Sequence, residues 1–174
     1  MLGSFPPKRE KWSMEFFYPN FINDFWRIMG LIFFGDREHF IIKDTGKPHF
    51  DKAAVKRFCT ERGIALYDTA TAVRRLRDNA SDQFLEIVER TDIPSLLSRL
   101  PSCRAVVSTG GKSASELCGS LGCGVPPVGG MTRAGVGTRT VDVWRMPSTS
   151  RAYPLAFEKK AAEYRKMFEQ ENLL

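Results

Sequence analysis

Short apolar runs alternate with segments of helical periodicity along this chain, and this alternation constrains its fold more than any other feature. Four runs have the length of buried strands, at residues 1–4, 64–67, 105–107 and 140–146. Five segments carry helical spacing or helix-ending signals, at residues 22–33, 51–62, 93–100, 112–121 and from near Pro154 onward. Strands connected through helices pair in parallel. The sequence therefore predicts an α/β fold, a three-layer sandwich whose central, mostly parallel, four-stranded sheet is flanked by helices.

Individual residues predict where these elements begin and end. In the first helical segment the apolar residues fall on one face, Asn20 suits the N-cap and Gly35 suits the stop. The run at 64–67 is expected to be a buried strand with Asp68 at its carboxyl end, followed by a polar segment at 74–82. The tract at 122–138 is rich in glycine and proline, so we expect a loop there.

The length and charge of the chain bear on its organisation and its partner. At 174 residues it has the size of one domain, which we expect to span residues 1–174. Basic residues give it a net charge of +6, and the surplus lies in residues 1–60 and 121–174, three charges in each. A fold that brings these two regions together concentrates positive charge on one face, which suits a polyanionic partner.

Several classes of protein do not fit the sequence. The four cysteines form no C-x-x-C pair and lie far from both histidines, so we expect no metal site. No apolar run approaches the length of a membrane span, and the first residues lack the order of a signal peptide, so we expect a cytoplasmic protein. No G-x-S-x-G motif accompanies His39 or His49, which argues against a hydrolase triad.

Four loops follow the predicted strands, at residues 4–7, 68–69, 108–110 and 147–150. In open α/β sheets ligands bind outside the carboxyl ends of the strands, so we expect these loops to line one cleft. The loop at 110–113 resembles the end of a phosphate-binding P-loop, but Val106 stands where that motif needs glycine. A simple helix start is the better interpretation of this loop.

Three other positions each allow a functional and a structural interpretation. Ser148, Thr149 and Ser150, next to Arg151, suit phosphate oxygens, although from composition alone a Ser/Thr turn leading into the helix is the better interpretation. Asn23 lies in the first turn of a predicted helix, where it either holds a polarised water or caps the helix. Asp68 either reads a base edge or serves as a turn residue or a partner for Arg74 or Arg75, which belong to a basic run at 74–77.

Taken together, these segments resemble the uracil-DNA glycosylase superfamily. Residues 3–7 (GSFPP) look like its first motif, the strand-end turn at the water and sugar, and residues 63–70 (GIALYDTA) look like its base-reading strand. Residues 146–152 (MPSTSRA) are similar to its second motif, the loop that enters the minor groove, in the form found in mismatch-specific thymine/uracil glycosylases. Residues 17–19 (FYP) and 23–27 (NDFWR) look like the segment shared by the mismatch-specific and hypoxanthine-DNA glycosylase branches.

The chain departs from the family pattern at two motif positions. Phe5 stands where the first motif usually offers Asp or Asn, and Met146 stands where classical uracil enzymes use histidine. The hypoxanthine branch uses an asparagine that matches Asn23, so the resemblance implies that Asn23 holds the hydrolytic water. Only Met1 and Leu2 precede the first motif, and we expect a truncated first strand.

The resemblance implies a monofunctional glycosylase that acts as a monomer on double-stranded DNA carrying a damaged base, with no metal or cofactor. The damaged base, uracil or hypoxanthine, is flipped out of the duplex before its glycosidic bond is cut. The implied localisation is cytoplasmic, at the nucleoid if the source is bacterial. Base-binding residues are then Phe5, Phe17, Tyr18 and Asp68. Residues that contact the DNA backbone or the minor groove are Ser4, Pro147, Ser148, Thr149, Ser150 and Arg151.

Two alternatives remain open at this point. The first is a DNA- or nucleotide-binding module that kept the cleft and lost its chemistry, which the phenylalanine and methionine in the two motifs favour. The second is a small-molecule hydrolase, which is disfavoured because no nucleophile–base pair is visible. Base release from damaged DNA distinguishes the glycosylase from both.

Overall fold

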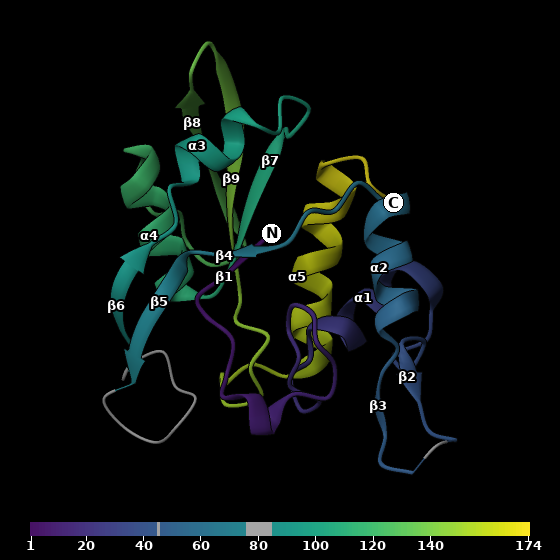
Figure 1. Cartoon of the computed structure of the whole chain (residues 1–174). Helices are drawn as coiled ribbons and strands as arrows, with labels where there is room; N and C mark the ends of the chain where they lie inside the picture. Colours follow the sequence, from purple (N-terminus) through teal and green to yellow (C-terminus); the bar gives the residue numbers. More distant parts are fainter. Residues whose placement is uncertain (45, 76–84) are drawn as a thin grey trace. The chain divides into compact units, whose positions relative to one another are not determined.

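A computed structural model describes residues 1–44, 46–75 and 85–174, and the chain divides into two compact units (Figure 1). We call the first the sheet unit; it consists of Met1–Phe5 and Leu66–Pro147. We call the second the helical unit; it consists of Pro6–Ala65 and Ser148–Leu174. Each unit is thus assembled from two segments that are distant in sequence. No helix in the described ranges has the length and hydropathy needed to cross a bilayer.

The sheet unit contains a five-stranded, mostly parallel sheet, which confirms the predicted α/β class. Its strand order is β4-β1-β7-β9-β8, with β1 parallel to β4 and β7, β7 parallel to β9, and β8 antiparallel to β9 (Figure 1). The strands are β1 (Leu2–Gly3), β4 (Tyr67–Asp68), β7 (Ala105–Thr109), β8 (Gly130–Val136) and β9 (Arg139–Met146).

The fifth strand, β8, lies in the glycine- and proline-rich tract that was predicted to be a loop. Ala134 and Val136 alternate with exposed neighbours and are buried, which is the period of a half-buried strand. Gly137 has a φ of 59°, a left-handed conformation that favours glycine, and it leads directly into β9. The glycines therefore marked a tight hairpin turn, and the prediction of a continuous loop and a four-stranded sheet was wrong.

The second predicted strand is shorter and more exposed than expected. Within the run at 64–67 only Tyr67 belongs to β4, and its side chain is 41% exposed. Among the described residues, the strand lies at the edge of the sheet and pairs with β1. After it comes a hairpin of β5 (Ala70–Arg75) and β6 (Leu85–Arg90), where a polar segment was predicted; residues 76–84 lie outside the described ranges.

Two helices pack against one apolar cluster of the sheet unit, α3 (Ile93–Ser98) and α4 (Gly111–Leu121), close to where the sequence predicted helices. The end of α3 is held by Arg139 of β9. Its guanidinium donates to the carbonyl oxygens of Leu97 at 2.7 Å, Leu100 at 2.8 Å and Pro101 at 3.1 Å, and also to that of Cys103. A carbonyl oxygen has two lone pairs, so this arginine adds a second hydrogen bond to the Leu97 and Leu100 carbonyls, which also accept from backbone N–H groups.

The helical unit contains α1 (Phe25–Phe34), α2 (Lys52–Glu61), α5 (Phe157–Gln170), a short 3₁₀ turn η1 (Arg9–Lys11) and a two-stranded ribbon of β2 (Ile41–Ile42) and β3 (His49–Phe50). Helix α1 ends at Gly35, as predicted, with a left-handed φ of 70°. It begins at Phe25 rather than near Asn20, with Asp24 at the N-cap, and the Asn23 Oδ1 accepts the N–H of Phe25, its first residue; Ile22, which was expected on the buried face, is exposed. Buried rings then link the elements: Phe33 contacts Phe58 of α2 and Phe168 of α5.

Candidate nucleic-acid interface

Four parallel strands of the sheet unit end at the same edge, because their registers align. Leu2 pairs with Tyr67 and Ser108, and Ser108 pairs with Arg145. The strand order reverses direction between β1 and β7, which is a topological switch point, where open α/β sheets bind ligands. Of the four predicted strand-end loops, those at 4–7, 68–69 and 108–110 begin at this edge. The fourth begins there with Pro147 and continues into the helical unit.

One row of residues crosses this edge on a single face of the sheet. Gly3 is aligned with Asp68, and Thr109 is aligned with Met146. Asp68, the predicted base-reading residue, is half-buried, and its backbone carbonyl accepts a hydrogen bond of 2.7 Å from the Thr91 hydroxyl. Met146 is buried, so the position at which classical uracil enzymes carry histidine is part of the core here.

Thr69 follows Asp68 and was not singled out in the sequence. Its backbone N–H donates to Gly3 at 2.9 Å and its carbonyl accepts from Thr91 at 3.1 Å. Its hydroxyl is buried and has no hydrogen-bond partner in the described part of the chain. Leaving a buried polar group unsatisfied costs about 1–3 kcal/mol, so such groups are rare in stable cores. The only sequence signal that could have identified Thr69 as a site residue was its position after an apolar strand.

The helical unit holds Asn23 by its backbone and its side chain. The Asn23 N–H donates to the Asn20 carbonyl at 2.9 Å, and its Oδ1 accepts from the Phe25 N–H at 2.9 Å. Its carbonyl accepts from Arg27 at 3.1 Å. The capping interpretation is therefore correct for Oδ1. An amide oxygen has two lone pairs, and Nδ2 makes no hydrogen bond to any described residue.

Arg27 immobilises the turn that carries Asn23. Its guanidinium donates to the Phe21 carbonyl at 2.5 Å as well as to Asn23, and it lies 4.5 Å from the centre of the Phe21 ring and 5.3 Å from that of Phe50. Burial lowers the pKa of Arg27, and the positive charge of Arg151 lowers it further. The arginine stays charged at neutral pH because its ordinary pKa is so high.

Phe17 and Tyr18, predicted to stack on a flipped base, lie beside the start of α1. The Tyr18 ring stacks on Phe25 with 3.8 Å between centroids, and Tyr18 has a φ of 51°. A positive φ is uncommon for a bulky residue and is found preferentially where function demands it. The Phe17 carbonyl accepts from the Trp26 indole at 3.0 Å, which fixes the backbone beside its ring.

The loop at 148–151 has the Ser/Thr turns that the sequence allowed as its structural interpretation. The Ser148 hydroxyl accepts from the Ser150 N–H and the Ser150 hydroxyl accepts from the Ala152 N–H, both at 3.2 Å. Both hydroxyls keep their own O–H donors for another acceptor. Thr149, by contrast, is only 2% exposed, and its carbonyl accepts from the Asp24 N–H at 2.9 Å. Ser148 and Ser150, which are half-buried, are thus the accessible hydroxyls of this loop.

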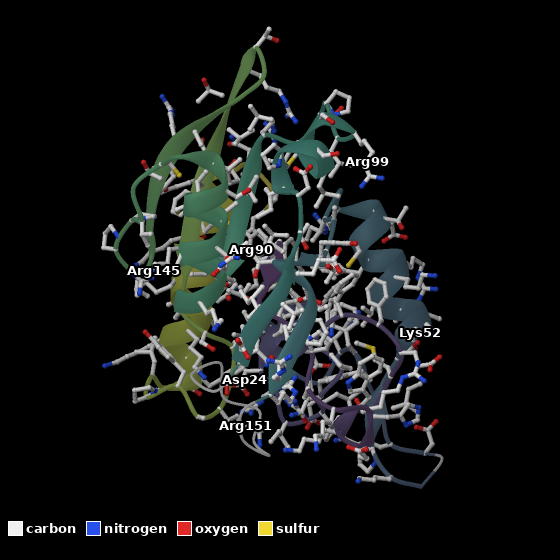
Figure 2. The ribbon with its side chains drawn as sticks, turned by 60° about the vertical axis from the view of Figure 1, so that its left-hand side comes forward. Asp24, Lys52, Arg90, Arg99, Arg145 and Arg151 are labelled. Atoms are coloured by element: carbon white, nitrogen blue, oxygen red, sulfur yellow. The ribbon has the colours of Figure 1, made fainter. Side chains whose placement is uncertain are left out.

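A buried carboxylate connects this loop to α1 and α5. Asp24 Oδ2 lies 3.1 Å from Lys160 Nζ, and Asp24 Oδ1 lies 3.3 Å from Arg151 Nε. Figure 2 labels Asp24 and Arg151. Lys160 also donates to the Ser150 carbonyl at 2.8 Å. Sequence reasoning missed Asp24 and Lys160, although a lysine on the buried face of an amphipathic helix is itself a signal for a buried ion pair.

The remaining candidate positions give less support for a functional role. Arg74 pairs with Glu86 at 3.4 Å in the hairpin, and Arg77, from the same basic run, falls outside the described ranges. The His39 ring stacks on Phe34, which is a structural role. The described residues contain no cluster of three or more metal-ligating side chains. An open hollow in the helical unit includes none of the predicted site residues; it is lined by Arg9, Trp12, Ser13, Met14 and Glu15.

Comparison of the chain with protein-family models, with curated proteins and with solved structures finds no match.

Proposed function

We propose that this protein is a monofunctional DNA glycosylase that hydrolyses the N-glycosidic bond of deaminated bases, uracil or hypoxanthine, in DNA. The observation that supports this most is the rigid placement of Asn23 in the same unit as the loop at 148–151. Asp24, the next residue, bonds directly to that loop. A water-positioning group and a phosphate-binding loop are the two parts that base excision requires together.

Asn23 is the proposed catalytic residue. Its amide oxygen lies at the start of α1, where free N–H groups and the helix dipole favour a polarised water. With the backbone fixed by Asn20 and Arg27, the amide needs little rearrangement before the reaction. Asn23 holds the water below the sugar as the glycosidic bond lengthens and positive charge develops on the sugar ring.

Asp68 is the proposed reader of the base edge, and its chemistry suits deaminated bases. An ionised carboxylate only accepts hydrogen bonds. Uracil and hypoxanthine both present a ring N–H next to a carbonyl, whereas cytosine and adenine present an unprotonated nitrogen next to an amino group. A carboxylate at this edge therefore favours the deaminated bases, while Phe5, Phe17 and Tyr18 stack on the flipped ring.

The proposed DNA-backbone contacts are Ser4 and Pro147 in the sheet unit and Ser148, Ser150 and Arg151 in the helical unit. Hydroxyls and arginine are common donors to phosphate oxygens. Thr149 contributes through its buried backbone contact with Asp24. The proposal keeps the expectations of a three-layer sandwich, a monomer, a cytoplasmic location and chemistry without metal or cofactor.

The test is base release from duplexes that carry uracil, hypoxanthine, xanthine or a thymine mismatch, with abasic sites detected by alkaline cleavage. We expect release from at least the uracil or hypoxanthine duplex, and loss of that release in Asn23→Ala. Asn20→Ala is the matched control, because Asn20 Oδ1 also accepts a backbone N–H, that of Ile22 at 3.2 Å, in the same turn. Full activity of Asn23→Ala would remove Asn23 from the mechanism.

A second function is favoured by one specific observation. Phe5 offers no hydrogen bond to water where the first motif usually does, and Asn23 Oδ1 already caps a helix. Both features fit a DNA-binding module without chemistry. That module shows salt-dependent duplex binding and no abasic product from any duplex in the panel.

A further inference from the structure

Asp24 is enclosed by positive charge. The carboxylate is 5% exposed, and each of its oxygens contacts a different cation: Oδ2 contacts Lys160, which is 1% exposed, and Oδ1 contacts Arg151. One carboxylate and two cations leave one positive charge in excess. Lys160 is buried, so that excess reaches solvent through the Arg151 side chain, which is 51% exposed.

The contact with Asp24 determines which edge of Arg151 remains available. Asp24 takes the Nε–H, at the base of the guanidinium plane. The two Nη groups make no hydrogen bond to any described residue, and they form a planar pair of donors. That fork matches two oxygens of one phosphate in a bidentate contact.

The backbone beneath Arg151 is also held. Lys160 Nζ donates to the Ser150 carbonyl at 2.8 Å, and Asp24 N–H donates to the Thr149 carbonyl at 2.9 Å. Two consecutive carbonyls are thus fixed immediately before the arginine. Binding to a group that is already ordered costs less entropy than binding to a mobile one.

We infer that Asp24 is a positioning residue that orients Arg151 as a bidentate clamp for one phosphate of the DNA backbone, an inference that rests on the proposed function. The carboxylate favours binding by orienting Arg151. Its negative charge opposes binding, because it lies close to the proposed DNA contact. The two effects have opposite signs, and this makes the inference testable.

The test is duplex binding, measured by fluorescence anisotropy over a series of salt concentrations with a duplex that contains an abasic site. If Asp24 positions Arg151, Asp24→Asn weakens binding about tenfold, the loss of one oriented charged contact. If the carboxylate acts only through charge, the same substitution tightens binding. The matched control is Asp142→Asn, because Asp142 Oδ1 accepts from Arg133 Nε at 3.0 Å on an exposed strand pair. The control is expected to leave binding unchanged or to tighten it slightly.

A second pair of variants gives an answer even if Asp24→Asn fails to fold. Arg151→Gln removes the charge, and Arg151→Lys keeps the charge but has neither an Nε–H nor a fork. The clamp predicts that both weaken binding to a similar extent, and that only Arg151→Gln reduces the salt slope, by about one. Wild-type affinity in Arg151→Lys would overturn the clamp.

An arginine-selective NMR experiment separates this inference from the proposed function. In the wild-type protein without DNA, we expect an Arg151 Nε–H resonance that exchanges slowly with water, because it is hydrogen-bonded. It should move to the position of a solvated arginine in Asp24→Asn. If this holds while the wild-type protein binds no duplex, the proposed function fails and the orientation of Arg151 stands. An Arg151 resonance insensitive to Asp24→Asn overturns the inference itself.

Discussion

Each unit contains an arginine that is held by hydrogen bonds, but the two arginines use different donors for them. This difference separates an arginine with a structural role from one with a candidate functional role. In the sheet unit, Arg139 directs its donors to four backbone carbonyls at the end of α3. In the helical unit, Arg151 donates from Nε to one carboxylate and leaves its outer donors without protein partners among the described residues. An arginine whose two Nη groups are engaged by backbone carbonyls stabilises a fold, whereas one that is held through Nε with its Nη groups available is ready for a ligand.

The units also differ in what they bury. The sheet unit has a core of aliphatic side chains and cysteine, gathered between the sheet, α3 and α4. The helical unit buries Asp24, Arg27 and Lys160 among aromatic rings. Buried charges add little net stability when they are paired, and they become costly when a partner is removed. The helical unit should therefore be the more sensitive of the two to a single change of charge.

The largest expected effect is that of breaking the buried ion pair. Asp24→Ala leaves the buried Lys160 ammonium without a negatively charged partner, so the free energy of unfolding should fall by about 3–5 kcal/mol. Denaturant unfolding measures this directly. Adding Lys160→Met should recover most of the loss, since an apolar side chain of similar length needs no counterion. A double variant as unstable as the single one would show that the ion pair is not the cause.

The next effect tests the structural arginine of the sheet unit. Arg139→Ala removes the donor to the carbonyls at the end of α3, and we expect a loss of about 2 kcal/mol in unfolding free energy. Duplex binding of the folded variant should stay at the wild-type level, because this arginine has no proposed contact with DNA. The same substitution at Arg151 should have the opposite outcome, with nearly unchanged stability and weaker binding.

A smaller effect, a gain in stability, is expected at the edge of the sheet where the four parallel strands end. Thr69→Val replaces a buried hydroxyl that has no partner in the described residues with a methyl group of similar size, so the protein should gain about 1 kcal/mol of stability. Ser108→Ala is the control, because the buried Ser108 hydroxyl donates to the Trp144 carbonyl at 2.8 Å. Thermal unfolding should show a higher Tm for the first variant and a lower Tm for the second. A lower Tm for both would mean that the Thr69 hydroxyl has a partner in solution.

The smallest expected effect concerns the pH dependence of the unfolding free energy, which should be similar in the two units. Burial raises the pKa of Cys59 in the helical unit to about 11, and it also raises the pKa of Cys118 in the sheet unit to about 11. Both thiols stay neutral in the folded state while those of the unfolded chain ionise. Stability from this source is complete below pH 9, the ordinary pKa of the thiol, and is lost as the pH rises from 9 toward 11. Cys59→Ala and Cys118→Ala should each flatten that decline in unfolding free energy to a similar extent.

Much of the fold followed from local patterns. The helices α2, α3 and α4 and the strands β7 and β9 lie where apolar periodicity and glycine stops predicted them. The strands that were missed include β8 and the hairpin of β5 and β6. In both, the strands carry many polar or small residues and pair within the same stretch of chain. Their pairing depends on turn geometry more than on apolar content.

The candidate site was predicted in part. Asn23, Asp68 and Arg151 were singled out because helix starts and strand ends can be recognised in the sequence, and their proposed roles stay predictions. Asp24 and Lys160 were not found, because their pairing joins residues that are 136 positions apart. Thr69 was not found either, since a missing hydrogen bond appears only when every neighbouring donor and acceptor has a position in space.

The separation between Asp24 and Lys160 also has a consequence for synthesis. The helical unit needs the segment Ser148–Leu174 to be complete, and strand β1 of the sheet unit must await partners from β4 and β7. As the chain leaves the ribosome, Asp24 emerges long before its lysine, with nothing to neutralise it in a folded environment. The ion pair of Asp24 with Lys160 is therefore expected to form only when α5 docks, so the residue next to the candidate catalytic asparagine is fixed later than the turn around that asparagine.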